Sequence, residues 1–578
     1  MAPQITGYVV NKVQNLLSGG SAVAQDKDHD VLVNVFIRWS ENDFEGNSLI
    51  ALASITILVL ALLSGLFMFF MRQTLIVMSR LIEYDQKNEI FKHYQELDTN
   101  FYKTHNTGDL MNRISEDVSR VRMYTGPAIM YLVNLAVRIS LCTYFMVRKD
   151  WLLTIYVLAP LPILAIIIYY VNTIIHQRSE KIQALLSDLT TNAQQSYSGI
   201  RVIKSYVQEK AMYGFFNKNS EEYKKNAIGL AKIESVYFPS MALMIGLSTL
   251  ITVGIGSYQA LTDPATKAGL IVEFIIYINM LTFPVSAIGW VASMIQRASA
   301  SQKRINEFLH TVPTVVNETG KTGVSLKGTI RFNNVDFTYE HTGIQALKNF
   351  NLVINPAEKV LIVGRTGSGK STIAQLLLRF FDATNGSITI NNTDVKNISL
   401  GRLREQISYV PQDVFLFSDS VKDNIEFGVT GNNNITAELA ASYASIDKEI
   451  KDFPKGYETL IGERGVTLSG GQKQRISIAR ALMKDSDLII LDDCLSAVDA
   501  KTEHEITKNL NQYLGEKTAI IITHRIITSI NFNQVIVMNE GAVLEHGTHS
   551  ELLQKQGYYA ELFRKQMAGL SDEELSKL

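Results

Sequence analysis

The segment GRTGSGKST, residues 364–372, has the residue types and the spacing that bind a polyphosphate. It follows the apolar run KVLIV and matches the pattern G-x-x-x-x-G-K-[ST] at Gly364, Gly369, Lys370 and Ser371. Glycines let backbone N–H groups turn inward around phosphate oxygens, a following helix adds positive potential, and a lysine supplies a mobile cation. A glycine-rich turn that matches by chance is the alternative, but it would not also join a strand to the helical run STIAQLLLRF. The predicted nucleotide-binding residues are Gly364, Arg365, Thr366, Gly367, Ser368, Gly369, Lys370, Ser371 and Thr372.

A carboxylate and a second glycine-rich turn add to this chemistry. The apolar run LIILDD, residues 488–493, brings Asp492 to a strand end, where it can hold Mg²⁺ together with the Ser371 hydroxyl. The segment LSGGQ, residues 468–472, opens the helical run KQRISIARALM and forms a second phosphate cradle. Two cradles in one domain indicate that each serves a different nucleotide. The second cradle comprises Ser469, Gly470, Gly471 and Gln472.

The second half of the chain has the pattern of an α/β domain that would position these residues. Short β-branched runs alternate with helical stretches, which predicts a largely parallel sheet that is buried on both faces. The strand candidates are IRFNNVDFTY, KVLIVG, ISYVP, DLIIL, TAIIITH and QVIVMNEGAVLE. We expect a linker at 311–327, where Pro, Gly, Thr and Asn occur without periodicity, then a nucleotide-binding domain at 328–567 and a tail at 568–578.

The first half, residues 1–310, is predicted to be a helical membrane domain. Residues 73–125 and 177–235 repeat apolar side chains at helical spacing among charges, which predicts helices that extend into water. These two stretches carry most of the Lys and Arg of this half, so the positive-inside tendency places them in the cytoplasm. The segments with the length and apolarity to span a bilayer are 48–71, 126–147, 151–175, 236–260 and 268–292.

Counting five crossings from a cytoplasmic C-terminal half would place Met1 outside the cell, yet the opening MAPQITGYVVNKVQNLL does not have the pattern of a signal peptide. It has the pattern of the outer end of a helix whose apolar body is missing. We therefore expect a sixth span before residue 1, as in a chain whose start is truncated.

Several residues inside the spans are unusual for a lipid environment. Pro160, Pro162 and Pro284 can bend helices. Arg138 is expected either to line a cavity or to extend toward the interface. Glu273 is expected to lie close enough to the outer interface to remain in contact with water.

The composition narrows the functional classes. The chain of 578 residues is 46% hydrophobic, with a mean hydropathy of +0.07, which is too apolar for a wholly soluble protein. Its 55 basic and 56 acidic residues give a formal net charge of −1, so no global field recruits nucleic acid. This argues against a cytosolic ATPase that acts on DNA. The two cysteines, Cys142 and Cys494, are far apart and are expected to be reduced thiols.

Over nearly its whole length the chain resembles the ATP-binding cassette (ABC) exporters. The motifs that carry the resemblance are the phosphate loop at 364–372, LSGGQ at 468–472, LDD at 491–493 and SAVD at 496–499. The resemblance implies an all-α transmembrane domain of the type I exporter fold, fused to an α/β RecA-like P-loop domain, with ATP and Mg²⁺ as cofactors. It also implies that two nucleotide-binding domains close head to tail, so that each ATP lies between two subunits.

The resemblance assigns roles to further residues. Tyr339 in DFTYE matches the aromatic that stacks on adenine, and Gln412 in YVPQD matches the loop glutamine that senses Mg²⁺. Glu463 in GERG matches the loop that contacts the intracellular helices, and His524 after TAIIIT matches the switch histidine beside the γ-phosphate. Each alone has a plainer explanation as a core or turn residue, but their shared order and spacing favour the functional one. Segments 104–123 and 198–216 resemble the two coupling elements of the family.

Asp493 departs from the usual pattern, in which a glutamate after the Mg²⁺-binding aspartate polarises the attacking water. We expect Asp493, His524 and Gln412 to be catalytic. Hydrolysis should nevertheless be slow, because the aspartate is one methylene shorter and general-base assistance is typically worth ~10²–10⁴ in rate. The segment DDCLSAVDAKTE also resembles the aspartate-bearing subunit of heterodimeric multidrug-type exporters, whose sister carries the glutamate. A homodimer with two equal, slow sites is the alternative.

The expected function is ATP-driven export of an amphipathic drug, lipid or peptide by an exporter half that alternates between inward and outward openings. The expected partners are a second exporter half, the lipid bilayer and the substrate, and not nucleic acid. The expected location is the cytoplasmic (inner) membrane, with multiple passes. The alternative is a non-transporting regulatory subunit whose occluded ATP holds a dimer together.

Overall fold

The computed structural model describes residues 1–17, 29–44, 47–262, 268–316, 327–429, 435–462, 465 and 468–567. They belong to two compact units, which we describe separately. One unit comprises Met1–Gln95 with Gly108–Thr311, and the other comprises Glu96–Thr107 with Val312–Leu578. Most of the predicted linker and all of the predicted tail lie outside the described residues.

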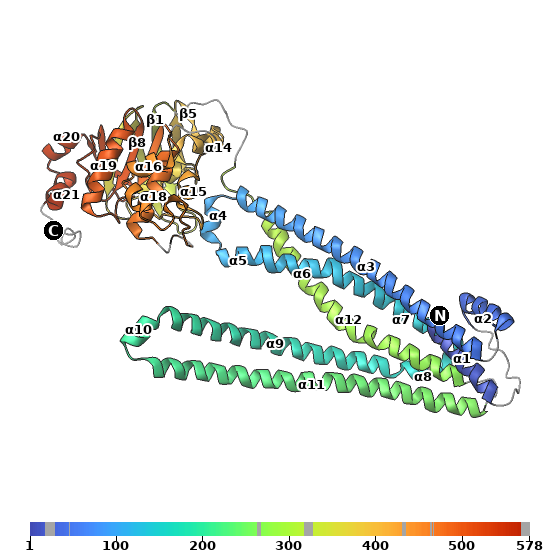
Figure 1. Cartoon of the computed structure of the whole chain (residues 1–578). Coiled ribbons are helices and arrows are strands. Elements are labelled where there is room, and N and C mark those ends of the chain that lie inside the picture. Colours follow the sequence, from blue (N-terminus) through green and yellow to red (C-terminus); the bar gives the residue numbers. More distant parts are fainter. Residues whose placement is uncertain are drawn as a thin grey trace. The chain divides into compact units, whose positions relative to one another are not determined.

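The first unit is helical, and its long helices contain the five predicted membrane spans (Figure 1). Each of these helical segments has at least 42 residues and is therefore about 60 Å or longer, roughly twice the thickness of the hydrocarbon core. The polar ends must extend into water. Within the described part of the chain, the segments long and apolar enough to cross a membrane are Asn47–Glu96, Thr107–Lys149, Trp151–Ser198, Glu209–Gln259 and Ala268–Leu309.

The helical unit begins with α1 and α2, which precede the long helix α3. A composite segment follows, in which the π-helical turns η1 and η2 interrupt the α-helix. The bounds are α1 (Ala2–Leu17), α2 (Val31–Asp43), α3 (Asn47–Glu96), α5 (Thr107–Asn112), η1 (Arg113–Asp117), α6 (Val118–Met123), η2 (Tyr124–Ala128) and α7 (Ile129–Lys149). They continue with α8 (Trp151–Leu158), α9 (Pro160–Ser198), α10 (Ile200–Ser205), α11 (Glu209–Thr262) and α12 (Ala268–Leu309).

Several prolines lie where helices begin or are distorted. Pro127 lies inside the π turn η2, a common response to a proline that cannot donate a backbone hydrogen bond. Pro160 is the first residue of α9 and Pro162 lies in the same first turn, where no N–H donor is needed. Pro284 lies inside α12. Pro160 and Pro162 therefore lie in the first turn of a helix, whereas α12 continues through Pro284.

Glu273 in α12 is buried, and the prediction that it remains in contact with water was wrong. Its exposed fraction is 2%, the Tyr277 hydroxyl donates to its Oε1 at 3.1 Å, and Lys149 Nζ lies 3.9 Å from its Oε2. The reason is that α1 packs against this end of α12, so closely that a Cβ on Gly7 would lie 3.3 Å from the Glu273 carboxylate.

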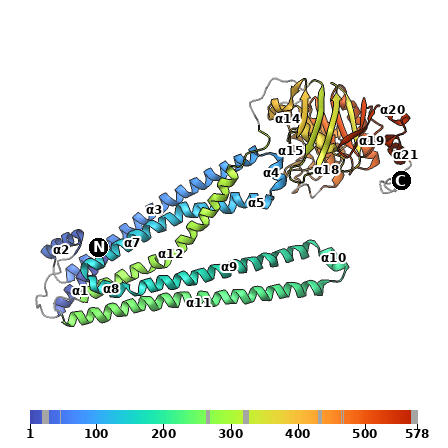
Figure 2. The same ribbon diagram turned by 180° about the vertical axis from the view of Figure 1, so that it is seen from behind.

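Helices α9 and α11 lie side by side along most of their length, with α10 at the turn between them (Figures 1 and 2). The side chains around this turn are exposed although several are apolar or aromatic: Tyr197 is 77% exposed, Tyr206 73% and Val207 79%. The tip of this hairpin therefore presents apolar surface that its own helical unit does not cover.

The second unit contains two sheets. The larger has the order β10-β9-β3-β8-β7-β6, and all neighbours are parallel except β10 and β9. Its strands are β3 (Lys359–Gly364), β6 (Ile407–Val410), β7 (Leu488–Asp492), β8 (Thr518–Thr523), β9 (Gln534–Asn539) and β10 (Ala542–Gly547). The smaller sheet is antiparallel and comprises β1 (Ile330–Thr338), β2 (Gln345–Ile354), β4 (Asn385–Ile390) and β5 (Thr393–Asp394).

Alternate residues of the parallel strands enter two different hydrophobic cores. Leu361, Val363 and Ile489 pack with the helices from α15 to α21 on one face. Val360 and Ile362 pack with α13 and the antiparallel sheet on the other face. The predicted two-sided burial of the parallel sheet is therefore present. The helices are α13 (Lys370–Leu377), α14 (Leu400–Glu405), α15 (Val421–Glu426), α16 (Ala437–Tyr443), α17 (Asp447–Lys451), α18 (Gly470–Met483), α19 (Ala500–Leu514), α20 (His549–Gln554) and α21 (Tyr558–Met567), with the 3₁₀ turns η3 (Val395–Asn397) and η4 (Gly456–Glu458).

A short helix from the first half of the sequence, α4 (Thr99–Thr104), belongs to this second unit. Asp98 caps it by accepting from the Phe101 N–H at 3.1 Å, and its other oxygen accepts from the Val315 N–H at 3.1 Å and from Thr314. The predicted coupling element began at residue 104, but only its first four residues group with the second unit. The docked helix lies just before it.

Candidate functional site

The parallel strands bring the predicted site residues to one edge of the sheet. β3, β8 and β7 are neighbours, so the segments that follow them meet at their carboxyl ends. The phosphate loop follows β3, Asp493 follows β7 and His524 follows β8, and open α/β sheets bind ligands at this edge. A cavity of about 390 Å³ lies here, and its lining includes Tyr339, Thr366, Gly367, Gly369, Lys370, Ser371, Thr372, Gln412, Asp492, Asp493 and His524.

The phosphate loop needs its glycines because other backbone atoms approach it closely. A Cβ on Gly369, whose φ is +93°, would lie 2.2 Å from the Ala346 carbonyl oxygen. A Cβ on Gly364 would lie 2.3 Å from the Met538 carbonyl oxygen. Ser368 is buried, and its hydroxyl has no hydrogen-bond partner among the described residues. A buried, unsatisfied hydroxyl in such a loop fits a loop that bonds a ligand.

Lys370 is positioned above this loop. Its ammonium donates to the carbonyl oxygens of Gly364 and Arg365, each at 2.8 Å. Burial lowers its pKa from the ordinary lysine value, while the charges of Asp493 and Asp492 oppose that change. The loop carbonyls are uncharged acceptors, so the anionic oxygens of a phosphate would bind this ammonium more strongly.

Ser371 and Asp492 form the predicted metal-binding pair. The Ser371 hydroxyl donates to Asp492 Oδ1 at 2.9 Å, and the Tyr409 hydroxyl lies 3.5 Å from Asp492 Oδ2. Burial raises the pKa of Asp492 to about 6, against an opposing hydrogen bond from Ser371. In the described residues, no group of three or more His, Cys, Asp or Glu side chains could hold a metal ion. A hydroxyl and one carboxylate suit Mg²⁺, which keeps several waters and takes other oxygens from phosphates.

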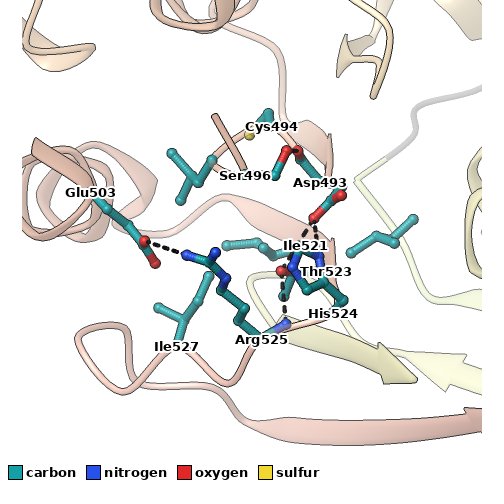
Figure 3. Close-up of a pocket in the computed structure, with 11 residues that line it drawn as sticks. Asp493, Cys494, Ser496, Glu503, Ile521, Thr523, His524, Arg525 and Ile527 are labelled. Carbon is teal, nitrogen blue, oxygen red and sulfur yellow. Dashed lines mark hydrogen bonds and ion pairs between the residues drawn. The ribbon is translucent and has the colours of Figure 1, made fainter. Parts of the chain in front are cut away.

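Asp493 lies beside the two other predicted catalytic residues, and Figure 3 shows its contact with one of them, His524. Its Oδ1 is 3.0 Å from His524 Nδ1, and its Oδ2 accepts from Gln412 Nε2 at 3.3 Å. Its backbone has a φ of +48°, a left-handed conformation in which Asp and Asn are enriched. The Thr523 hydroxyl lies 3.5 Å from the same Oδ1 and accepts from the Arg525 N–H at 3.2 Å. Gln412, which follows β6, and His524, which follows β8, thus fix the orientation of this carboxylate.

The LSGGQ segment forms a helix N-terminus at a different place in the domain. Ser469 caps α18 and forms a reciprocal capping box with Gln472, whose amide also donates to Glu449 at 3.0 Å. Gln474 of the same helix accepts from the Ala497 N–H at 3.0 Å, which ties α18 to the SAVD turn. None of the LSGGQ residues lines the cavity that holds the phosphate loop. The structure therefore brings the phosphate loop, Asp492 and Asp493 together, but not the two phosphate cradles.

Two residues of this site were not found from the sequence. Lys103 of α4 places its ammonium 4.7 Å from the centre of the Tyr339 ring and lines the cavity. Tyr339 itself is held by its hydroxyl, which lies 3.0 Å from Thr372 Oγ1. Tyr409 adds a hydroxyl beside Asp492. The remaining predicted residue, Glu463, lies outside the described residues.

Comparisons with known proteins agree with this geometry. Residues 14–285 match the family described as ABC transporter transmembrane region, and residues 347–496 match the family described as ABC transporter. The chain is 38% identical over 499 residues to the "Probable multidrug resistance ABC transporter ATP-binding/permease protein YheI" of Bacillus subtilis (strain 168), covering 86% of this chain and 85% of the relative. It is 34% identical over 520 residues to the multidrug resistance-like ATP-binding protein MdlA of Escherichia coli (strain K12), covering 89% and 88%.

Two further comparisons concern a lipid transporter and the fold. The chain is 33% identical over 492 residues to the ATP-dependent lipid A-core flippase of Legionella pneumophila, covering 85% of this chain and 83% of the relative. The solved structure of a bacterial Atm1-family ABC exporter with ATP bound superposes with a TM-score of 0.75 at 24% identity, covering 98% of this chain and 95% of that one. The chain therefore belongs to the ATP-binding cassette exporters: it is an exporter half of the inner membrane whose cytoplasmic nucleotide-binding domain hydrolyses ATP to drive export.

Proposed function

We propose that this exporter half moves an amphipathic compound across the membrane as part of a dimer, with ATP held between the two halves. The observation that carries this is the separation of the two cradles: the phosphate loop lines the cavity, and LSGGQ does not. A polyphosphate bound at Lys370 therefore has no cap from its own chain. The LSGGQ helix of a second half would supply it, and capture of ATP would then draw the two halves together.

Within its own half of the site, each residue has a distinct task. Tyr339 supplies the flat ring for adenine, and the N–H groups of residues 364–372 surround the phosphates. Lys370 exchanges its carbonyl partners for phosphate oxygens. Ser371, Asp492 and Gln412 would hold Mg²⁺, which when bound neutralises charge on the β- and γ-phosphates.

We propose that hydrolysis at this site is slow because of Asp493. Its carboxylate is already engaged by His524 and Gln412, and its side chain is one methylene shorter than the usual glutamate. A water at the γ-phosphate would therefore be oriented less well, with an expected loss of ~10²–10⁴ in rate. The intact LSGGQ would instead complete a competent site on a sister half that carries a glutamate. This supports a heterodimer over a homodimer.

Reconstitution tests both proposals. The chain would be placed in vesicles alone and with a candidate sister half, and ATP-dependent movement of a fluorescent amphiphile would be measured. We expect movement with the sister and little with the chain alone, and Lys370→Ala should reduce nucleotide capture at this chain's site. If no pairing moves any amphiphile while ATP is still bound, the chain is a regulatory subunit instead. ATP turnover by the chain alone at the rate of the heterodimer would contradict the slow site.

A further inference from the structure

A second cavity, of about 370 Å³, lies in the helical unit and is separate from the nucleotide site. Three membrane helices line it: α3, α7 and α12, of which α3 and α7 lie side by side in both views (Figures 1 and 2). Its wall combines sulfur-containing and aromatic side chains with two arginines. The lining residues that matter here are Met71, Arg72, Tyr131, Asn134, Arg138 and Phe283.

Arg138 lies deep in the membrane domain. It is about 16 Å from the end of α7 at Lys149, at 1.5 Å per residue, which is about half of a hydrocarbon core roughly 30 Å thick. Of the two outcomes expected from the sequence, the structure favours the cavity lining. Arg72 directly follows the predicted span 48–71 in α3 and lines the same cavity.

Neither arginine is neutralised by the protein. No acidic residue lines the cavity, and in the described part of the chain no carboxylate lies within ion-pair distance of either guanidinium. The other charged pairs of the helical unit, such as Lys149 with Glu273 and Arg304 with Asp117, have both partners in place. An ionised side chain at this depth is costly, and one that faces a cavity rather than a partner points to a ligand.

We propose that this cavity is a substrate site for an amphiphile with an anionic head group, a phosphate, sulfate or carboxylate on an apolar body. The planar guanidinium forks of Arg72 and Arg138 match such an oxyanion. Methionine and aromatic side chains adapt to an irregular apolar body. The volume suits a head group with part of its apolar body. This inference rests on the proposed export function and specifies its substrate class.

The same lining disfavours other substrates. A cationic amphiphile would place its charge beside two unpaired guanidinium groups with no carboxylate to offset them. A neutral amphiphile would leave both arginines without an acceptor. The expected order of affinity is therefore anionic, then neutral, then cationic, for compounds that share one alkyl tail.

Binding is measured first, without ATP, on the complete transporter in phosphatidylcholine nanodiscs. The probe is a fluorescent alkyl phosphate, and the competitors share its tail but carry phosphate, hydroxyl or trimethylammonium heads. We expect the phosphate competitor to bind at least about tenfold more tightly than the trimethylammonium one. Inorganic phosphate alone should not compete. Competition by phosphatidic acid placed in the disc would identify a membrane lipid as the source, and competition by the soluble alkyl phosphate alone would identify a compound from the aqueous phase.

The variants are Arg72→Gln, Arg138→Gln and the double variant, with Arg→Lys at each position to restore charge. Each Gln variant should reduce affinity for the alkyl phosphate about tenfold, and Lys should restore part of it. Arg148→Gln is the matched control, because Arg148 is an exposed arginine at the far end of the same helix and does not line the cavity. Thermal unfolding and ATP binding of each variant show that it is folded.

The outcomes separate the substrate site from the export function. The anionic site is wrong if the phosphate, hydroxyl and trimethylammonium competitors, which share one tail, displace the probe equally well. It is also wrong if a folded double variant binds the alkyl phosphate with unchanged affinity. Competition by inorganic phosphate equal to that of the amphiphile overturns the amphiphile requirement. If the alkyl phosphate binds selectively but no amphiphile is moved across the membrane with ATP, the export function is wrong and the anionic site stands. Equal movement of cationic and anionic probes in the wild-type and double-variant proteins overturns the site and leaves export intact.

Discussion

At the scale of single residues, Asp493 is the position where adding one methylene to the side chain is expected to change the rate of ATP hydrolysis most. His524 and Gln412 already hold its two oxygens, so a longer carboxylate at the same backbone position would extend past them toward the γ-phosphate. We predict that Asp493→Glu raises ATP turnover at this chain's site by at least tenfold, within the range of general-base effects. The measurement is single-turnover hydrolysis by the assembled transporter, with a sister half whose own site is inactivated.

The control for this prediction is Asp493→Asn, which keeps the size but removes the base. It should hydrolyse no faster than the wild-type site. If Asp493→Glu and the wild type turn over equally, the chain length of this carboxylate does not limit the rate.

In the absence of metal, the ionised carboxylate of Asp492 should lower the free energy of unfolding of the nucleotide-binding domain. Burial raises its pKa from the usual 3.8 to about 6, which corresponds to about 3 kcal/mol at most. Below pH 3.8 the carboxyl is protonated in both folded and unfolded states and there is no cost. Between pH 3.8 and 6 the unfolded chain ionises first, so stability falls as pH rises, and above pH 6 the full cost is present.

We therefore predict that Asp492→Asn raises the unfolding temperature of the nucleotide-binding domain at pH 7.5 in EDTA, and that the gain shrinks toward pH 4. Calorimetry of the full chain in detergent would measure it. The exposed Asp452→Asn is the matched control and should change nothing. The same Asp492→Asn variant should lose Mg²⁺-dependent nucleotide binding, because it removes a proposed ligand of the metal.

Residue types and spacing were sufficient to predict Lys370, Ser371 and Asp492 as neighbours, because each follows a strand whose carboxyl end must lie at one sheet edge. The same argument could not find Lys103 or Tyr409. Lys103 reaches Tyr339 from a helix in the other half of the sequence. Tyr409 begins the segment YVPQD, but the motif assigns a role only to Gln412 and gives no sign that the Tyr409 hydroxyl lies beside Asp492. Contacts made across the sequence by single side chains leave no local pattern.

At the scale of elements, Asp98 attaches α4 to Thr314 and Val315, in the segment that leads into the nucleotide-binding domain. Burial alone would raise the pKa of this carboxyl, but hydrogen bonds from Thr314, Phe101 and Val315 lower it below its usual range. A lowered pKa means that the attachment is present above the usual aspartate pKa of about 4 and is lost as pH falls further, through the folded-state value. At neutral pH the carboxylate is charged and the attachment is intact.

We predict that Asp98→Ala uncouples the two activities of the transporter at neutral pH. The loss of one helix cap and of the bonds to Thr314 should cost about 1–3 kcal/mol locally, so ATP still binds but substrate no longer stimulates ATP turnover. The measurement is ATPase rate with and without a transported amphiphile. Asp85→Ala, an exposed carboxylate on α3, should keep full stimulation. Normal stimulation of the Asp98→Ala variant would exclude this attachment from coupling.

Element boundaries show how far periodicity alone can predict. The five membrane spans were predicted from the length of the apolar segments, and the strands that precede the motifs were predicted from β-branched runs. The predicted coupling element at 104–123 contains the short helix α5 (Thr107–Asn112), whereas α4, which belongs to the second unit and is capped by Asp98, was not predicted as a separate helix. The burial of Glu273 was also missed, since it depends on α1 packing across α12.

At the scale of the whole molecule, the separation of LSGGQ from the phosphate loop supports the proposal that each half needs the other. We predict that Ser469→Arg in this chain abolishes most ATP turnover of a heterodimer although this chain's own phosphate loop is untouched. The reason is that the bulky cation blocks the cap over the sister's nucleotide. Turnover of the purified heterodimer measures this. Lys473→Arg, one helical turn along α18, is the matched control and should keep turnover. Unchanged turnover in the Ser469→Arg heterodimer would show that LSGGQ does not complete the sister's site.

The need for two halves followed from the resemblance to the exporter family, whereas the exposed tip of the α9–α11 hairpin did not follow from the sequence. The exposed Tyr206 and Val207 at the turn after α10 became visible only once α9 and α11 were seen as a hairpin. A helical period gives the apolar stripe of one helix, whereas an uncovered tip is a property of the assembled unit.

The two thiols of the chain are both buried, with exposed fractions of 4% at Cys142 and 3% at Cys494, and neither forms a disulfide. Burial also raises the pKa of the Cys494 thiol, so little reactive thiolate is available there. Maleimide reagents should consequently leave the folded native chain unlabelled. A spin label or fluorophore attached to a single introduced cysteine, for example at the exposed position of Val207, would then report distances during the transport cycle without first removing the native sulfurs.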